Sequence, residues 1–324
     1  MNNNNSPADA QVNNQQAIQS LKEIALEGIK EQRASRRWKI FFMLIFALMF
    51  FLFIMAIKTA SMAGDNRFSM AEEYTAVVDI KGIIMSNTDA SADNVIPALQ
   101  DAFEDDKAKG IILNCNTPGG SPVQSSLIYD EIMRLRKLHP DKPIHAVAGD
   151  LCASGGYFIV SAAENIYANR SSLVGSIGVR MKSFGLVEVM KKIGIESREM
   201  TAGKYKALID PFKPSTPEAE AHIKRMLSST HKHFIDSVKA GRGDRLKDNG
   251  DIFTGLFWTG EDAKTLGVID DFGSVASVAR DIIKAETTIN FSPQKTLLDK
   301  LSSRVGASIS TLLLEKEITQ TVLY

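Results

Sequence analysis

The sequence predicts an α/β domain with a largely parallel sheet, preceded by one N-terminal transmembrane helix. Two observations lead to this prediction. An uninterrupted apolar segment occupies residues 40–57, and beyond residue 73 short apolar runs alternate with amphipathic segments in the order β-α-β-α-β. Strands that alternate with helices pair in parallel in layered folds. With 324 residues, the chain is long enough for one or two domains.

The apolar segment contains 18 residues without a polar side chain, among them six of the 16 Phe residues of the chain. As a helix it spans about 27 Å, close to the thickness of the hydrocarbon core of a bilayer. A buried core helix is the alternative, but core helices seldom lack a polar face over such a length. We therefore expect a transmembrane helix over residues 40–58.

Basic residues flank this segment unequally. Six Lys and Arg residues between positions 22 and 39 precede it, and two follow within about 20 residues. The positive-inside rule then places residues 1–39 in the cytoplasm and the rest of the chain outside. A cleaved signal peptide is the competing interpretation, because Ser61-Met62-Ala63 resembles a cleavage site. A 39-residue charged region is long for a signal peptide, which favours an uncleaved anchor.

The remaining chain divides by composition into three parts. Residues 59–73 are small and polar and predict a linker, and residues 74–285 hold the alternating strands and helices of the domain. Residues 286–324 form a C-terminal tail, in which apolar residues at helical spacing suggest an amphipathic helix. These residues are Leu297, Leu298, Leu301 and Val305.

Each element of the domain follows from its residue types and their period. β-branched residues predict the first strand, and short apolar runs predict buried parallel strands. Segments with apolar residues along one stripe, closed by turn residues, predict helices. The predicted strands are 74–84, 110–114, 144–148 and 166–168, and the predicted helices are 95–107, 121–138 and 157–163.

The composition excludes several classes of function. The 38 basic and 38 acidic residues cancel, whereas a nucleic-acid-binding protein usually has a basic excess. Two cysteines are too few for a disulfide scaffold or a Cys-rich zinc site. Cys115 fits a buried strand residue better than a reactive thiol. No cofactor or metal is predicted.

Two glycine-rich turns follow predicted strands, where chemistry gathers in such folds. They are Asn116-Thr117-Pro118-Gly119-Gly120 and Ala153-Ser154-Gly155-Gly156. Paired glycines leave backbone N–H groups open to a ligand, and two such groups can stabilise an oxyanion. The Ser154 hydroxyl, at the start of a helix, is placed to attack a carbonyl group. The structural alternatives are an ordinary turn and a helix N-cap.

A nucleophilic serine needs a base, and no histidine lies between Ser154 and Ala221. A Ser-His-Asp triad is therefore poorly supported. The alternative base is a lysine that burial keeps neutral. Lys204 and Lys206 lie in an otherwise uncharged run that ends at Asp210, and position alone does not distinguish them. Cys152 is a weak alternative nucleophile, because no histidine near it in sequence can activate a thiolate.

Several motifs of the sequence resemble a known family, the bacterial signal peptide peptidase A family of membrane-anchored serine proteases. The resemblance implies a Clp/crotonase-like fold for residues of roughly 75–285. It lies in an ordered set of motifs, each of them weak alone. These are Pro118-Gly119-Gly120, Ala153 to Tyr157, Val174 to Val179, Gly203-Lys204-Tyr205-Lys206, and Trp258-Thr259-Gly260 with Gly267 to Asp270.

The resemblance also implies roles for single residues. Ser154 matches the nucleophile, and Lys206 matches the general base, because the family places it last in a Gly-x-x-Lys run. Ser176 matches a hydroxyl that orients the lysine amine. Gly119 and Gly155 match the backbone donors of the oxyanion hole. The residues Asn114 to Thr117 depart from the small polar residues that the family usually carries before Pro-Gly-Gly.

The implied function is that of a serine endopeptidase that degrades signal peptides after their release in the membrane. The implied location is the bacterial inner membrane, single-pass, with the catalytic domain on the periplasmic side. The length matches the half-length form of the family, which implies a homo-oligomer; Ser154 and Lys206 then come from one subunit or from two. An inactive scaffold and a crotonase-type acyl-transfer enzyme remain alternatives. The joint presence of Ser154, Ser176 and Lys206 argues against the scaffold, and the Ser–Lys pair and the anchor argue against the acyl-transfer enzyme.

Overall fold

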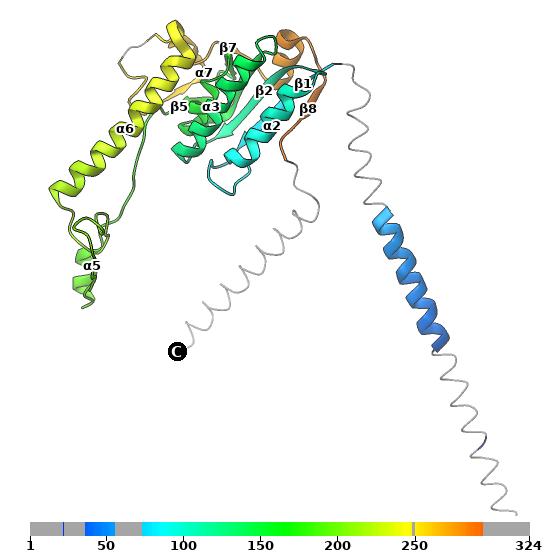
Figure 1. The fold of residues 1–324 in the computed structure, drawn as a ribbon, viewed down its shortest axis with the longest axis horizontal. Coiled ribbons are helices and arrows are strands. Elements are labelled where there is room, and N and C mark those ends of the chain that lie inside the picture. The colour runs from blue at the N-terminus through cyan, green and yellow to red at the C-terminus, as the bar shows by residue number, and fades with distance from the viewer. Residues whose placement is uncertain (1–21, 23–35, 56–72, 248–249, 294–324) are drawn as a thin grey trace, which may run out of the picture. The chain divides into compact units, whose positions relative to one another are not determined.

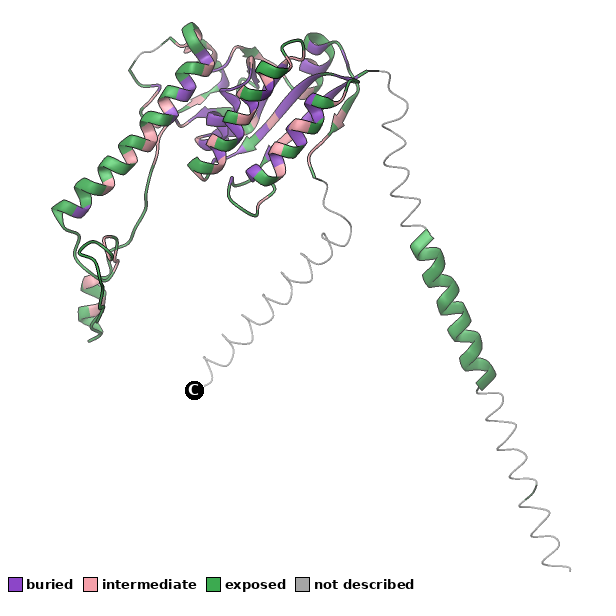
Figure 2. Cartoon of the chain, in the orientation of Figure 1, coloured by how far each residue is buried: buried purple, intermediate pink, exposed green. Residues whose placement is uncertain are grey.

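The computed structural model describes residues 22, 36–55, 73–247 and 250–293, and the chain divides into two units, residues 1–71 and 72–324. The first unit contains the helix Arg36–Met55, which is long and apolar enough to cross a membrane. Its large apolar side chains are exposed along its whole length (Figure 2). Most of the predicted cytoplasmic tail and linker, and the predicted helix at 297–305, lie outside the described residues.

The second unit is built on one sheet of mostly parallel strands, as the sequence predicts (Figure 1). The strands run in the order β6-β5-β3-β2-β1-β8, and β4 pairs with β3 and with β7. β6 is antiparallel to β5, and the other pairs are parallel. The strands are β1 (Tyr74–Lys81), β2 (Ala108–Thr117), β3 (Ile144–Ala153), β4 (Asn165–Ala168), β5 (Leu173–Gly175), β6 (Phe257–Thr259), β7 (Asp271–Phe272) and β8 (Thr288–Asn290).

The helices connect these strands and cover the sheet. Ser121 caps the helix that follows the first glycine turn, because its Oγ accepts a hydrogen bond from the N–H of Gln124. The helices are α2 (Ala92–Glu104), α3 (Pro122–Leu138), α4 (Gly155–Val160), α5 (Val187–Lys192), α6 (Pro217–Arg242), α7 (Gly260–Thr265) and α8 (Val275–Ser277). A 3₁₀ turn, η1 (Gly243–Arg245), and a π-helical turn, η2 (Val278–Ile283), complete them.

The core lies along the central strands, whose apolar runs are buried (Figure 2). Ile111, Ile112 and Leu113 in β2 are fully buried, as expected for a strand covered on both faces. At the edge of the sheet, β8 pairs with β1 from Thr75↔Thr288 to Val77↔Asn290. The sheet therefore includes residues that the sequence analysis placed in the C-terminal tail, because a three-residue edge strand has too little pattern to be recognised.

A segment that we call the arm, residues 180–230, extends from this core (Figure 1). It contains α5 and the outer turns of α6, and it is exposed almost throughout (Figure 2). The inner end of α6 is anchored instead. The ring of Phe234 stacks on that of Phe158 in α4, with centroids 4.8 Å apart, and the Tyr129 hydroxyl donates to the Ser237 carbonyl at 2.8 Å.

Candidate active site

Ser154 occupies a strained turn between a strand and a helix. β3 ends at Ala153 and α4 begins at Gly155, which leaves Ser154 at φ 53° and ψ −120°. A non-glycine residue at positive φ is destabilised by about 1–3 kcal/mol, and such strain gathers at functional sites. The backbone N–H of Ser154 donates to the Gly175 carbonyl at 2.8 Å, which holds the turn against β5. This is the backbone setting in which hydrolases present a nucleophilic serine.

The two glycine turns predicted from the sequence lie against each other. A Cβ atom added to Gly119 would lie 2.7 Å from the N atom of Gly155 and 2.8 Å from the Cβ atom of Ser154. A Cβ atom on Gly120 would lie 2.0 Å from the carbonyl oxygen of Ile84. Glycine is therefore required at both positions, because a side chain on Gly119 would separate the two turns and a side chain on Gly120 would clash with the backbone of Ile84.

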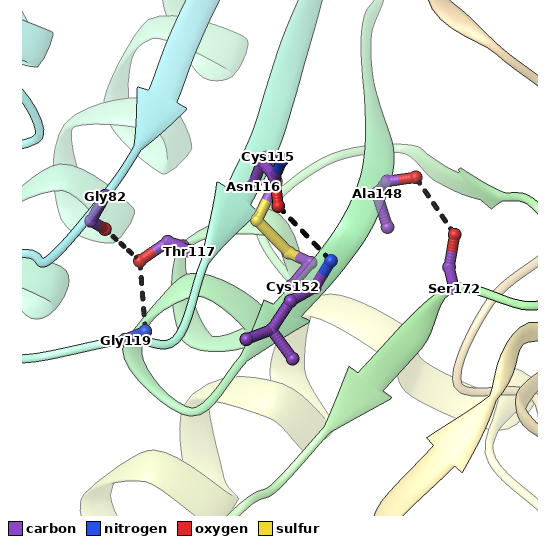
Figure 3. The surroundings of a disulfide bond; sticks show 9 residues. Gly82, Cys115, Asn116, Thr117, Gly119, Ala148, Cys152 and Ser172 are labelled. Atoms are coloured by element: carbon purple, nitrogen blue, oxygen red, sulfur yellow. Dashed lines mark hydrogen bonds between the residues drawn. A yellow bond between two sulfur atoms is a disulfide. The ribbon is translucent and has the colours of Figure 1, made fainter.

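The backbone N–H groups of these turns differ in their partners. The N–H of Gly119 donates to Oγ1 of Thr117 at 3.0 Å, and this hydroxyl donates in turn to the Gly82 carbonyl (Figure 3). The N–H groups of Gly120 and Gly155 have no acceptor among the described residues. They lie close together, because a Cβ atom on Gly155 would be 3.3 Å from the Gly120 N atom. Gly120, rather than the predicted Gly119, thus offers an available donor beside Gly155, a distinction that two adjacent glycines do not reveal in sequence.

The helix that follows Ser154 is fixed in the core. All six residues of α4 are buried. The Tyr157 hydroxyl donates to the Val268 carbonyl at 2.7 Å, and burial raises the pKa of Tyr157 to about 12, so that the hydroxyl stays a donor at neutral pH. The N-terminus of α4, which carries the N–H of Gly155, is therefore held in one orientation.

Ser176 lies next to the Ser154 turn. The register of β3 and β5 pairs Ala153 with Gly175, the residue before Ser176. Ser176 also has a positive φ of 51°, and its N–H donates to the Leu256 carbonyl at 2.8 Å. Four of the five residues predicted for the site, Ser154, Ser176, Gly119 and Gly155, are therefore brought together by the fold.

Lys206 is the residue that the chain does not bring to this site. It lies in the exposed arm, and its backbone N–H donates to the Gly203 carbonyl at 3.1 Å. Lys206 is exposed, and the arm extends away from the sheet (Figure 1). The amine of the neighbouring Lys204 lies over the Tyr205 ring, 5.0 Å from its centroid. Within one copy, Ser154 and the predicted base are thus separate.

A disulfide bond joins Cys115 in β2 to Cys152 in β3 (Figure 3). Cys115 is buried, as predicted, whereas its pairing with Cys152 was not predicted. The pairing depends on the parallel register of two strands, and the sequence separation of 37 gives no sign of it. Since neither sulfur is a free thiol, Cys152 is not a nucleophile in this structure.

Comparison with known proteins identifies the region around this site. Residues 136–288 match the sequence model described as peptidase family S49. Ser154, Ser176 and Lys206 lie within this range, whereas the turn at 118–120 precedes it.

Three curated relatives illustrate the similarity. A protein of Brucella melitensis named Na(+)/H(+) antiporter NhaA is 40% identical over 247 residues, which are 74% of this chain and 33% of that protein. A chloroplastic serine protease SPPA of Arabidopsis thaliana is 30% identical over 76% of this chain and 37% of its own length. Protease 4 of Salmonella typhi is 30% identical over 74% of this chain and 40% of its own length. The chain thus spans less than half the length of each of these relatives.

Proposed function

Because the chain belongs to peptidase family S49, the family of the SppA-type proteases, we propose that it is a serine endopeptidase whose nucleophile is Ser154. One observation carries this proposal. Ser154 is held at positive φ between a strand and a helix, directly beside two N–H groups without an acceptor among the described residues. A serine fixed in this way, next to free donors, fits acyl transfer better than a structural turn.

The proposed reaction begins with attack of the Ser154 Oγ on the peptide carbonyl carbon. The carbonyl oxygen becomes an oxyanion, which the N–H groups of Gly155 and Gly120 stabilise. One such donor contributes about 3–4 kcal/mol to the transition state. The N–H of Gly119 supports the turn through Thr117 and is not assigned to the oxyanion.

We assign the general base to Lys206, which takes the proton of Ser154 and returns it to the leaving amine. Ser176, beside the Ser154 turn, orients the lysine amine. We propose that Lys206 reaches the site from a neighbouring copy of the chain. The exposure of the arm supports this assignment, because an apolar surface of such extent on a protein in water usually meets a partner. Its exposed apolar side chains include Phe184, Ile193, Ile195, Met200 and Ile209.

The assembly that follows is a closed homo-oligomer in which each arm completes a neighbouring site. A repeated contact between two different surfaces of one chain closes into a ring when the rotation between copies permits it. The catalytic residues then act in two sets, the nucleophile and its donors from one copy and the base from the next.

The proposed location is the outer side of the bacterial inner membrane, with the helix Arg36–Met55 as an uncleaved anchor. The charge difference across the apolar segment supports this orientation. The disulfide supports it independently, because disulfides persist in the periplasm and are rare in the cytoplasm. The proposed substrates are signal peptides released in the membrane, because the anchor holds the site close to such peptides.

Labelling with a serine-reactive fluorophosphonate probe tests the assignment of the nucleophile. We expect the folded wild-type protein to be labelled and the Ser154→Ala variant to remain unlabelled. The exposed Ser171→Ala serves as a matched control and keeps wild-type labelling. Equal labelling of Ser154→Ala and wild type would exclude Ser154 as the nucleophile. Absence of labelling in the wild type would favour a scaffold or an acyl-transfer enzyme.

A further inference from the structure

We propose that the Cys115–Cys152 disulfide positions the two turns that form the oxyanion hole, so that the peptidase reaches its full turnover only in the disulfide form. This inference rests on the proposed function. The disulfide is not part of the reacting groups, and its role is exerted through the backbone of the turns that it joins.

The pairing of β2 with β3 is interrupted close to Ser154. β2 and β3 pair regularly as far as Cys115↔Ala148, and the next pair is Thr117↔Cys152. From one pair to the next, β3 therefore contributes more residues than β2. Residues 149–151 lie opposite the single residue Asn116, so β3 has two additional residues and bulges before the turn at Ser154. Regular pairing with β2 is therefore interrupted over residues 149–151 and resumes at Cys152.

Polar contacts hold this bulge weakly to β2, while on its other side Leu151 pairs with Leu173 of β5. The Asn116 side chain accepts from the Leu151 N–H at 3.3 Å and donates to the Asp150 carboxylate at 3.4 Å. Both bonds are long, and both are exposed to solvent. A cavity of about 890 Å³ borders Asn116, Gly149 and Asp150, so no packed side chains cover them on that side. The disulfide is the covalent connection between the strands at this level (Figure 3).

The disulfide also lies against the first turn of α4, which follows Ser154. Both cysteines are fully buried. A Cβ atom on Gly156 would lie 2.4 Å from Cγ2 of Thr117, 3.3 Å from the Cys115 Sγ and 3.7 Å from the Cys152 Sγ. The first turn of α4 therefore rests on a floor made of the disulfide and the Thr117 methyl group. Because Thr117 also binds the Gly119 N–H, this floor supports both turns that carry the proposed donors.

Reduction would change the dimensions of this floor. A dithiol such as dithiothreitol supplies two electrons and two protons, its own thiols become a cyclic disulfide, and the Cys115–Cys152 bond is broken to two thiols. The sulfur atoms then separate from bonding distance to non-bonded contact at about 3.5–4 Å. A displacement of about 1 Å in an active site can lower turnover by about 100-fold. The chain has no further cysteine, so a thiol-dependent effect reports on this bond.

The test compares peptide hydrolysis by the full-length wild type and by the double variant Cys115→Ala/Cys152→Ala. We expect kcat to fall by about 10- to 100-fold and KM to change by less than about threefold. Ile111→Ala is the matched control, because it removes a fully buried side chain at the other end of β2 and should leave kcat unchanged. Dithiothreitol should lower kcat of the wild type, reoxidation should restore it, and the double variant should not respond to either treatment.

A folded double variant with wild-type kcat overturns the inference. If the double variant does not fold, the experiment uses reduced wild-type protein instead. Alkylation and mass spectrometry confirm its two thiols. An unchanged kcat of this reduced protein would also overturn the inference. An equal loss of kcat in Ile111→Ala would assign a purely structural role to the disulfide.

Hydrogen exchange separates this inference from the proposed function. It is measured on oxidised and reduced Ser154→Ala protein, which needs no activity. Faster exchange at residues 117–121 and 153–157 after reduction supports the positioning role even if the wild type proves inactive, and unchanged exchange overturns it.

Discussion

The turn at Ser154 and the arm differ in how well each is packed within a single copy of the chain. Around Ser154, the end of β3, Gly119 and α4 are buried, and backbone hydrogen bonds or close contacts fix each of them. In the arm, Met200 is 99% exposed and Phe184 is 67% exposed, although both are large apolar side chains. A single copy can therefore form the nucleophile half of the site, whereas the half that carries Lys206 has no packed environment of its own.

This difference has a consequence for mutations. Substitutions near Ser154 act within one chain, through geometry that already exists. If the arm contacts a neighbouring copy, as proposed, substitutions in the arm should change activity without changing the stability of the isolated domain. Substitutions in the two regions test this difference.

Replacement of Ser154 should separate activity from stability. Ser154→Gly removes the nucleophile and also the side chain at positive φ, so we expect peptidase activity to fall by at least about 1,000-fold. The free energy of unfolding should rise by about 1 kcal/mol, because the strain at this position is relieved. Steady-state kinetics and urea denaturation measure the two effects. A stability below that of the wild type would mean that the turn is not strained.

Addition of one methyl group should distinguish the buried site from the arm. In Gly156→Ala the new carbon would lie 2.4 Å from Thr117 Cγ2, so α4 must shift, and we expect kcat to fall by about 100-fold. Gly185→Ala in the arm is the matched control, because no atom lies within 4 Å of the added carbon. Similar kcat values for the two variants would show that α4 tolerates movement and does not position the site.

Two arginines test the same contrast in stability. The fully buried Arg242 side chain holds Asp270 through two hydrogen bonds of 2.6 and 3.0 Å at the inner end of α6. Arg242→Ala leaves the partly buried Asp270 carboxylate with the more distant Arg245, at 3.5 Å, so the free energy of unfolding should fall by about 3 kcal/mol. In the arm, Arg198 forms a solvent-exposed ion pair with Glu196. Arg198→Ala should therefore change the free energy of unfolding by less than about 0.5 kcal/mol. Chemical denaturation of both variants checks the difference.

The parts of the fold that could be predicted from sequence are those with local signals. The run Gly110 to Asn114 is apolar enough to predict a buried strand. Ser121 predicts the start of α3, because serine is a common N-cap residue. Ser154 could be located because a serine and two glycines follow such a run. The family resemblance supplied the remaining predicted roles.

The other features depend on which segments meet in space. The disulfide needs the register of β2 against β3, and the edge strand β8 needs β1 as a template. The difference between Gly119 and Gly120 needs the Thr117 hydroxyl, which selects one of two adjacent N–H groups. The proposed partner of the arm is a neighbouring copy, so neither the sequence pattern nor a single copy of the chain could reveal the contact.

Replacement of Lys206 tests the base that the arm is proposed to supply. Lys206→Ala should lose activity as completely as Ser154→Ala, because nucleophile and base act as one unit, and Lys206→Arg should not restore it. Lys204→Ala should remain active. The opposite result for the two lysines would move the role of the base to Lys204.

The most direct test of the account is to mix the two inactive variants. Ser154→Ala keeps an intact arm with Lys206, and Lys206→Ala keeps an intact nucleophile turn. If the site is assembled from two copies, co-assembled oligomers of these variants contain some sites with both residues, and peptidase activity should return on mixing. Co-purification of differently tagged copies confirms that mixed oligomers have formed. Mixed oligomers that remain as inactive as each variant alone would contradict the account and place Ser154 and Lys206 of a working site in the same copy.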